Sequence, residues 1–236
     1  MPPTHICLSI ILSLFYCYFL SSKIPKGIPR LISLLPILYF FTILPLYISS
    51  KFLIGVTTFF ITWVANFKLL LFAFDQGPLS LTKNNVINKN PLVFILMAAL
   101  PLRSKQHSFI KNKTNKIPLN LGVEFVIFAV FLELTFHYKS QIHPNLILIC
   151  YCIMVFLMID ILVALSSFIV RNFLVGLKLE LEPPSNEPYL STSLQDFWGN
   201  RWNLTITNIL RLTVYNPVRS ALSEVVGKKW ALYVAM

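Results

Sequence analysis

Residues 145–170 read NLILICYCIMVFLMIDILVALSSFIV, an apolar run in which Asp160 is the only charged residue. A helix needs about 20 mostly apolar residues to cross a bilayer, so this run is long enough to span a membrane. Four further runs have the same character: residues 5–22, 31–48, 52–74 and 119–138. Of the 236 residues, 56% are hydrophobic and only 12% are charged, about half the charged share of a soluble domain. The sequence therefore predicts an all-α, polytopic transmembrane protein.

The apolar run 91–102 differs from these five because it is short and has a proline near each end. We expect it to be re-entrant or interfacial rather than to cross the membrane. The basic residues favour the same arrangement, because it places 17 Lys and Arg on one side and two on the other, against 13 and six if the run crosses. The positive-inside rule then predicts five crossings, with the N-terminus outside and the C-terminal region in the cytosol. No Lys or Arg precedes the first run, so we interpret it as a membrane span rather than a cleaved signal peptide.

The net charge of +11 does not indicate a nucleic-acid partner. The basic residues lie in short loops between apolar runs, which is typical of a topology signal and of contact with anionic headgroups. They form no stripe with interleaved aromatic residues of the kind that binds nucleic acid. The four cysteines lie inside apolar runs without the spacing of metal ligands or redox pairs: Cys7, Cys17, Cys150 and Cys152. We therefore expect neither a metal site nor a nucleic-acid partner.

Four charged residues lie within the predicted spans: Lys68, Glu124, Glu133 and Asp160. Charged groups in a membrane are costly and are functional candidates by default. Lys68 lies near the cytosolic end of its span, so snorkelling or a structural pairing is favoured over contact with a ligand phosphate. Asp160 needs a partner or a proton, and Lys68 is the nearest cation by depth. A structural network of the acids is favoured over a channel or a proton relay.

Residues 193–204, SLQDFWGNRWNL, form a dense polar and aromatic cluster, which we call the signature segment. The proline-rich loop before it, residues 182–189, ends the fifth span, and Thr192 or Ser193 is predicted to cap a new helix, with Asp196 placed as in a capping box. Polar residues then recur at helical spacing on one face: Asp196, Asn200, Asn203, Thr207 and Arg211. An apolar face lies beside it: Trp198, Trp202, Ile206, Ile209 and Leu210. Such a helix either lies in the membrane interface or contributes to a site.

The signature segment, together with Thr192 and residues 207–219, resembles the plant wax synthases of the membrane-bound O-acyltransferase superfamily. The run 65–78, ANFKLLLFAFDQGP, and the order of spans and loops are also similar to that family, so the resemblance covers most of the chain. It implies an acyl-CoA-dependent O-acyltransferase of the endoplasmic reticulum that forms esters of long-chain alcohols or sterols. Acyl-CoA is then a co-substrate, and no separate cofactor is expected. Asn200 is a departure, because the family often has an arginine there.

The resemblance also implies roles for individual residues. Asn203 matches the asparagine of the family's active chamber, where its amide would donate to the developing oxyanion or orient a histidine base. Trp198 and Trp202 would line the passage for the alcohol or acyl chain. Arg201 would neutralise a phosphate of CoA, and Asp196 is grouped with these three as a substrate-binding residue.

The family's histidine follows the signature, on a later span, whereas the four histidines of this chain precede it: His5, His107, His137 and His143. Residues 228–236 resemble the start of an unfinished span, so we expect a C-terminally truncated chain. Its two predicted parts are a transmembrane region, 1–170, and a signature region, 171–236. Two alternatives stay open: an inactive relative that binds lipid or a partner protein, and a small transporter or channel that uses the intramembrane acids.

Overall fold

The computed structural model describes residues 3–80, 85–103, 119–138, 141–173 and 181–225. Every regular element in these ranges is helical, which confirms the all-α prediction. The α-helices are α1 (Pro3–Phe19), α2 (Ile28–Ile43), α3 (Lys51–Thr57), α4 (Asn66–Ala73), α5 (Asn85–Lys89), α6 (Pro91–Ala99), α7 (Leu119–Tyr138), α8 (Pro144–Phe173), α9 (Leu194–Asp196), α10 (Leu204–Leu210) and α11 (Asn216–Val225). Three π-helical segments continue α-helices, at Thr58–Ala65, Phe197–Arg201 and Arg211–Tyr215. Short 3-10 turns lie at Ser21–Lys23, Leu44–Tyr47, Gly77–Leu79 and Pro188–Leu190.

Five helices of the described ranges are long and apolar enough to cross a membrane. They are Thr4–Lys23, Ile28–Tyr47, Lys51–Ala73, Leu121–Tyr138 and Pro144–Asn172, and their bounds confirm the five predicted spans. The third is one continuous helix made of α3, the π-helical segment Thr58–Ala65 and α4. The chain is therefore an integral membrane protein with several spans.

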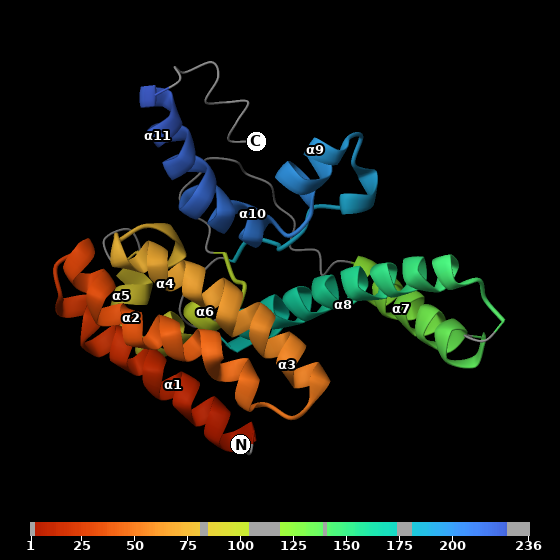
Figure 1. Cartoon of the computed structure of the whole chain (residues 1–236), viewed down its shortest axis with the longest axis horizontal. Helices are drawn as coiled ribbons and strands as arrows, with labels where there is room; N and C mark the ends of the chain where they lie inside the picture. Colours follow the sequence, from red (N-terminus) through yellow and green to blue (C-terminus); the bar gives the residue numbers. More distant parts are fainter. Residues whose placement is uncertain (1–2, 81–84, 104–118, 139–140, 174–180, 226–236) are drawn as a thin grey trace.

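The helices form three groups (Figure 1). α1 to α6 form a bundle, from which the α7–α8 hairpin projects, while α9 to α11 lie over one end of the bundle and hairpin. Apolar side chains from α1, α2, α4, α6 and neighbouring segments fill the bundle core, and the fully buried ones include Leu14, Leu34, Phe41, Phe72 and Phe94. This core fixes the positions of α4 and α6, which support the signature region.

A proline in the second span leaves a backbone carbonyl without its helical donor, and a side chain of the third span supplies one. Pro45 has no N–H, so the carbonyl of Phe41 loses its usual helical donor. The hydroxyl of Thr62 donates to that carbonyl at 2.7 Å, and the Nδ2 group of Asn66 donates to the carbonyl of Leu38 at 3.3 Å. Backbone groups inside a bilayer must be satisfied by the protein, so these polar side chains tie the two spans together.

The short helix α6 ends inside the bundle. Its nine residues rise about 13 Å, less than half of a bilayer's hydrocarbon thickness. Val93, Phe94 and Met97 are fully buried, and the ring of Phe94 contacts Tyr18 of α1 and Phe72 of α4. The length of α6 agrees with the prediction that this segment does not cross the membrane, and the choice between a re-entrant and an interfacial position stays a prediction.

The α7–α8 hairpin has few contacts with the rest of the described chain. Many of its large apolar side chains are exposed, among them Phe136, Leu148 and Ile149, as expected for helices in contact with lipid. The 30 residues of α8 give a length of about 45 Å, and the helix continues to Phe173. The proposed division of the chain at residue 170 stays a prediction.

Candidate active site

The signature segment is held by the proline-rich loop that precedes it. The N–H of Asn186 donates to the carbonyl of Arg201, and the N–H of Leu204 donates to the carbonyl of Pro184, each at 2.7 Å. Glu182, at the start of this loop, forms an ion pair with Arg103 at 2.7 Å. These contacts attach both ends of the loop, one to the signature segment and the other to the segment that follows α6.

The signature segment has the predicted helix cap at its start but departs from the predicted helix further on. Ser193 caps α9, since its Oγ accepts the N–H of Asp196 at 3.0 Å. The predicted continuous helix is wrong: the backbone is extended at Trp202 and left-handed at Asn203, with φ of 41°. Pairing with the proline-rich loop engages the backbone at this point, and asparagine tolerates the left-handed region better than most residues.

Asn203 is the N-cap residue of α10 and is 4% exposed. Its Oδ1 accepts the N–H of Ile206 at 3.4 Å, and its own N–H donates to the Oγ of Ser185 at 3.3 Å. No described residue accepts a hydrogen bond from its Nδ2 group. One half of the carboxamide therefore caps the helix, while the other half is available as a donor.

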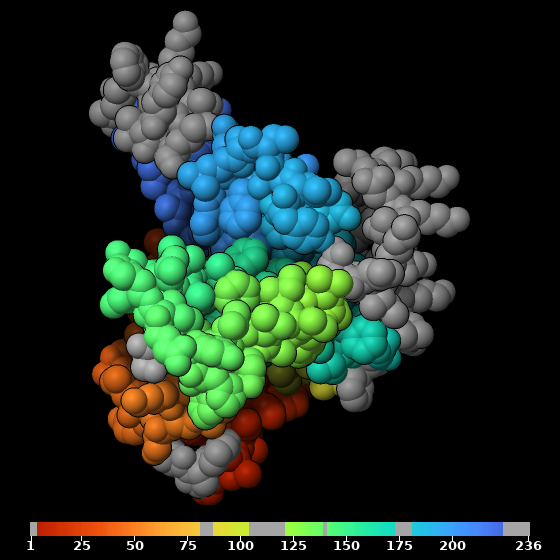
Figure 2. All heavy atoms as spheres, turned by 90° about the vertical axis from the view of Figure 1, so that its right-hand side faces the viewer, coloured from red at the N-terminus to blue at the C-terminus, as the bar shows by residue number. Residues whose placement is uncertain are grey.

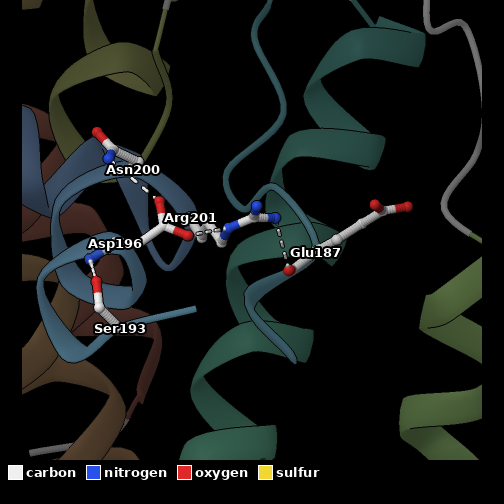
Figure 3. A network of polar contacts seen from close by, with 5 residues as sticks. All are labelled: Glu187, Ser193, Asp196, Asn200 and Arg201. Carbon is white, nitrogen blue, oxygen red and sulfur yellow. Dashed lines mark hydrogen bonds and ion pairs between the residues drawn. The ribbon is translucent and has the colours of Figure 1, made fainter. Parts of the chain in front are cut away.

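Arg201 is bound both to its own segment and to Glu187 of the loop that precedes it (Figure 3). Its Nε donates to Asp196 Oδ2 at 2.6 Å, and its Nη1 donates to the carbonyl of Glu187 at 3.4 Å. Asn200 donates to the other oxygen of Asp196 at 3.2 Å. These hydrogen bonds, that of Arg201 first, hold the pKa of Asp196 below its ordinary value. Asp196 thus partly neutralises Arg201, the cation for which the family resemblance implies contact with a CoA phosphate.

An aromatic cluster joins the signature segment to the membrane hairpin. Phe156 of α8 stacks on Trp202 at 5.4 Å between ring centroids, and Trp198 meets Trp202 edge-on at 4.8 Å. Trp202 Nε1 is buried without an acceptor among the described residues, whereas Trp198 is 52% exposed. A shallow depression beside Trp198 is lined by residues 191–194 and Phe197.

The acids in the spans do not pair with Lys68, the cation at a similar predicted depth in the membrane. Asp160, 6% exposed, accepts a hydrogen bond from Ser185 Oγ at 2.7 Å and is hydrogen-bonded to Glu124 of α7. The predicted pairing with Lys68 is wrong, because the Lys68 ammonium bonds to carbonyl groups after α6. Glu133 pairs instead with His137, one turn away on the exposed side of α7.

Ser185 is the functional candidate that the sequence did not identify. It lies in a loop whose prolines indicated only a helix end, and a single serine between Pro184 and Asn186 carries no recognisable pattern. Figure 2 shows the signature region, in light blue, lying above the green α7–α8 hairpin. That arrangement brings Ser185 to Asp160.

Thr205 attaches α10 to the segment that follows α6. Its hydroxyl is buried and donates to the carbonyl of Pro101, 104 residues earlier, at 3.1 Å. No pattern in the sequence marks this residue as part of the site. The signature region is thus attached both to the segment after α6 and to α8.

Of the predicted site residues, the structure brings Asp196, Trp198, Arg201, Trp202 and Asn203 into one region. The described histidines lie elsewhere: His5 is on α1, and His137 and His143 are at the turn of the α7–α8 hairpin. His107 lies outside the described residues. Within the described ranges, no three His, Cys, Asp or Glu side chains gather as a metal site.

Comparison with known proteins gives consistent results. Residues 181–236 match the sequence model described as "Membrane bound O-acyl transferase family". The chain is 40% identical to the probable long-chain-alcohol O-fatty-acyltransferase 3 of Arabidopsis thaliana, over 97% of this chain and 64% of that protein. It is 34% identical to the probable long-chain-alcohol O-fatty-acyltransferase 1 of that plant, over 98% and 67% respectively.

A third relative acts on a different alcohol. The acyl-CoA–sterol O-acyltransferase 1 of Arabidopsis thaliana is 39% identical, over 96% of this chain and 65% of that protein. The chain thus spans roughly two thirds of the length of the curated relatives it matches. No solved structure matches it.

Proposed function

The chain belongs to the plant long-chain-alcohol O-fatty-acyltransferases, or wax synthases, of the membrane bound O-acyl transferase family, and on this basis we propose that it takes part in transferring a fatty acyl group from acyl-CoA to an alcohol oxygen. The acceptor is a long-chain alcohol or a sterol, the two classes named by its relatives. Acyl-CoA is the co-substrate, and the product is a wax or sterol ester. The place of this chemistry is the endoplasmic reticulum membrane.

The carboxamide of Asn203 is the observation that carries this proposal. When an alcohol attacks a thioester, negative charge develops on the carbonyl oxygen, and a fixed donor in a water-poor site stabilises that charge. Asn203 is nearly fully buried, its backbone is held by Ser185, and its Oδ1 is engaged by Ile206. These contacts orient the Nδ2 group without using it, so it can donate to the oxyanion.

The reaction also needs a group that accepts the proton of the attacking hydroxyl. The described histidines lie on α1 and at the far turn of the hairpin, so none of them is assigned this role. The proposal for this chain therefore concerns the stabilisation of charge and the binding of substrate.

The surroundings of Asn203 suit an amphiphilic thioester. Trp198 and Trp202 provide an apolar surface next to the acyl or alcohol chain. Arg201 and Asp196 lie at the polar side, where Arg201 would meet a phosphate of CoA while Asp196 keeps its guanidinium oriented. A transporter is less well supported, because the described hydrogen bonds tie Lys68 to the end of α6 and Asp160 to Ser185, and do not join the two residues in one stripe across several spans.

The test is an acyl-transfer assay with membranes that contain the full chain, labelled acyl-CoA and a panel of fatty alcohols and sterols. Asn203→Asp is the sharpest variant, because aspartate also tolerates the left-handed region and caps helices well but lacks the Nδ2 donor. Asn203→Gly keeps the backbone conformation and removes both polar groups. Ser223→Ala is the control, since its exposed hydroxyl donates only to the carbonyl of Ser220.

We expect ester formation by the wild type and by the control, and a loss of about 100-fold or more in Asn203→Asp, as for removal of one oxyanion donor. Full activity of Asn203→Asp at equal protein level would remove Asn203 from the chemistry. No ester from correctly inserted wild type would reject enzymatic activity for this chain and favour a lipid-binding or partner-binding relative.

A further inference from the structure

Three groups form a continuous chain of hydrogen bonds between the membrane hairpin and the signature segment. The hydroxyl of Ser185 donates to Asp160 Oδ1 at 2.7 Å. The oxygen of the same hydroxyl accepts the backbone N–H of Asn203 at 3.3 Å. Because a hydroxyl donates once and accepts through its lone pairs, both bonds are made at the same time.

The direction of this chain of bonds is set by the carboxylate. Asp160 is an acceptor, so it obliges the hydroxyl hydrogen of Ser185 to point toward α8 and leaves the oxygen lone pairs facing Asn203. The N–H of Asn203 then has a well-placed acceptor. Without Asp160 the hydroxyl is free to rotate, and that acceptor loses its fixed orientation.

The contacts on either side show that the placement is rigid. Phe156 lies one turn before Asp160 on the same face of α8 and stacks on Trp202, the residue before Asn203. The backbone bonds of Asn186 and Leu204 hold the loop against the signature segment on both sides of Ser185. Asp160 also interacts with Glu124 of α7.

We propose that Asp160, acting through Ser185, is a positioning residue that holds Asn203 in its left-handed conformation with the Nδ2 donor free. The left-handed region is sparsely populated even by asparagine, which tolerates it better than most residues, so it persists where local contacts over-determine it. The hydrogen bond from the Asn203 N–H is such a contact, because it acts on the strained residue itself. We call the bonds from Asp160 through Ser185 to Asn203 the relay. Its importance for catalysis rests on the proposed acyl transfer, whereas its effect on the Asn203 backbone does not.

The relay is tested with four variants of the full chain in lipid nanodiscs. Ser185→Ala removes both hydrogen bonds, and Ser185→Thr keeps the hydroxyl. Asp160→Ala removes the acceptor, and Asp160→Asn keeps an oxygen that can accept from Ser185. Ser166→Ala is the control, since it removes an intramembrane hydroxyl of α8 that donates only to the carbonyl of Val163.

The first measurement is hydrogen–deuterium exchange at single-residue resolution, which does not depend on activity. We expect the Asn203 amide to exchange about five- to tenfold faster in Ser185→Ala and Asp160→Ala, the effect of one net hydrogen bond. Ser185→Thr and the control should match the wild type, and Asp160→Asn should be intermediate. Unchanged exchange in both alanine variants, with retained thermal stability, overturns the relay.

The second measurement is steady-state acyl transfer. We expect Ser185→Ala to lower kcat about five- to tenfold with little change in KM for acyl-CoA, and Ser185→Thr to restore kcat. Faster exchange with an unchanged kcat overturns the link between the relay and catalysis. If the wild type forms no ester, the proposed activity fails for this chain, and the exchange data alone decide whether Asp160 and Ser185 position Asn203.

Discussion

The ammonium group of Lys68 in α4 lies 2.6 Å from the carbonyl oxygen of Leu100, just beyond the C-terminus of α6. It also donates to the carbonyls of Met97 and Leu102 and is fully buried. The last carbonyls of a helix have no intrahelical donor and carry partial negative charge. Lys68 therefore satisfies the end of a helix that stops inside the bundle, and the snorkelling interpretation is wrong.

Replacing Lys68 should destabilise the bundle. Lys68→Met keeps the approximate shape but leaves buried carbonyls without a donor, at a cost of about 1–3 kcal/mol. We expect a lower unfolding temperature of the purified protein in detergent. Lys26→Met, at an exposed position, is the control, and equal unfolding temperatures of the two variants would show that Lys68 does not stabilise α6.

The contact between Thr205 and Pro101 should anchor the signature region to the bundle. Thr205→Val is nearly isosteric and leaves the Pro101 carbonyl without this buried donor, whereas Thr205→Ser keeps the hydroxyl. We expect Thr205→Val to be cleaved faster between residues 183 and 204 in limited proteolysis. Similar cleavage rates for the two variants would argue against the anchor.

Thr62 should hold the second and third spans together. In Thr62→Val the carbonyl of Phe41, already deprived of a donor by Pro45, loses its hydroxyl partner, at a cost of about 1–3 kcal/mol. The measurement is the unfolding temperature, with Thr58→Val as a matched change at an exposed position. An unfolding temperature equal to that of the control would contradict the role of Thr62.

The charge distribution predicts the orientation of the chain. A glycosylation acceptor with a flexible spacer, inserted between His143 and Pro144, should be modified in microsomes, because this turn is predicted to face the lumen. The same insertion between Pro25 and Lys26 should stay unmodified. The opposite pattern would reverse the predicted orientation, whereas modification at both positions would change the number of crossings.

Because Asp196 is bonded to Arg201, we expect its charge, and with it KM for acyl-CoA, to be independent of pH over the physiological range. Because the pKa of Asp196 is lowered in the folded state, its stabilising contribution is complete above the unfolded value of about 3.9 and is lost only below it. We expect KM for acyl-CoA to show no step from this residue between about pH 5 and 8.

Arg201→Gln should raise the KM for acyl-CoA, and an unchanged KM would exclude contact of Arg201 with CoA.

The spans could be predicted from the sequence because each depends on local composition. About 20 consecutive apolar residues satisfy their own backbone as a helix in lipid, so the five spans and the shortness of α6 follow without tertiary information. The cap at Ser193 is local in the same way, since its partner is the N–H of Asp196 three residues later.

Only the tertiary structure decided the partners of the buried polar groups. Lys68 meets Leu100 across 32 residues, Ser185 meets Asp160 across 25, and Thr205 meets Pro101 across 104. The break of the helix at Asn203 has the same origin. Helical spacing in the sequence assumes that the backbone bonds within the helix, whereas here the backbone of Arg201 and Leu204 bonds to the proline-rich loop. Sequence alone thus determined which segments lie in the membrane and which family the chain resembles, while long-range hydrogen bonds determined how Asn203 is presented.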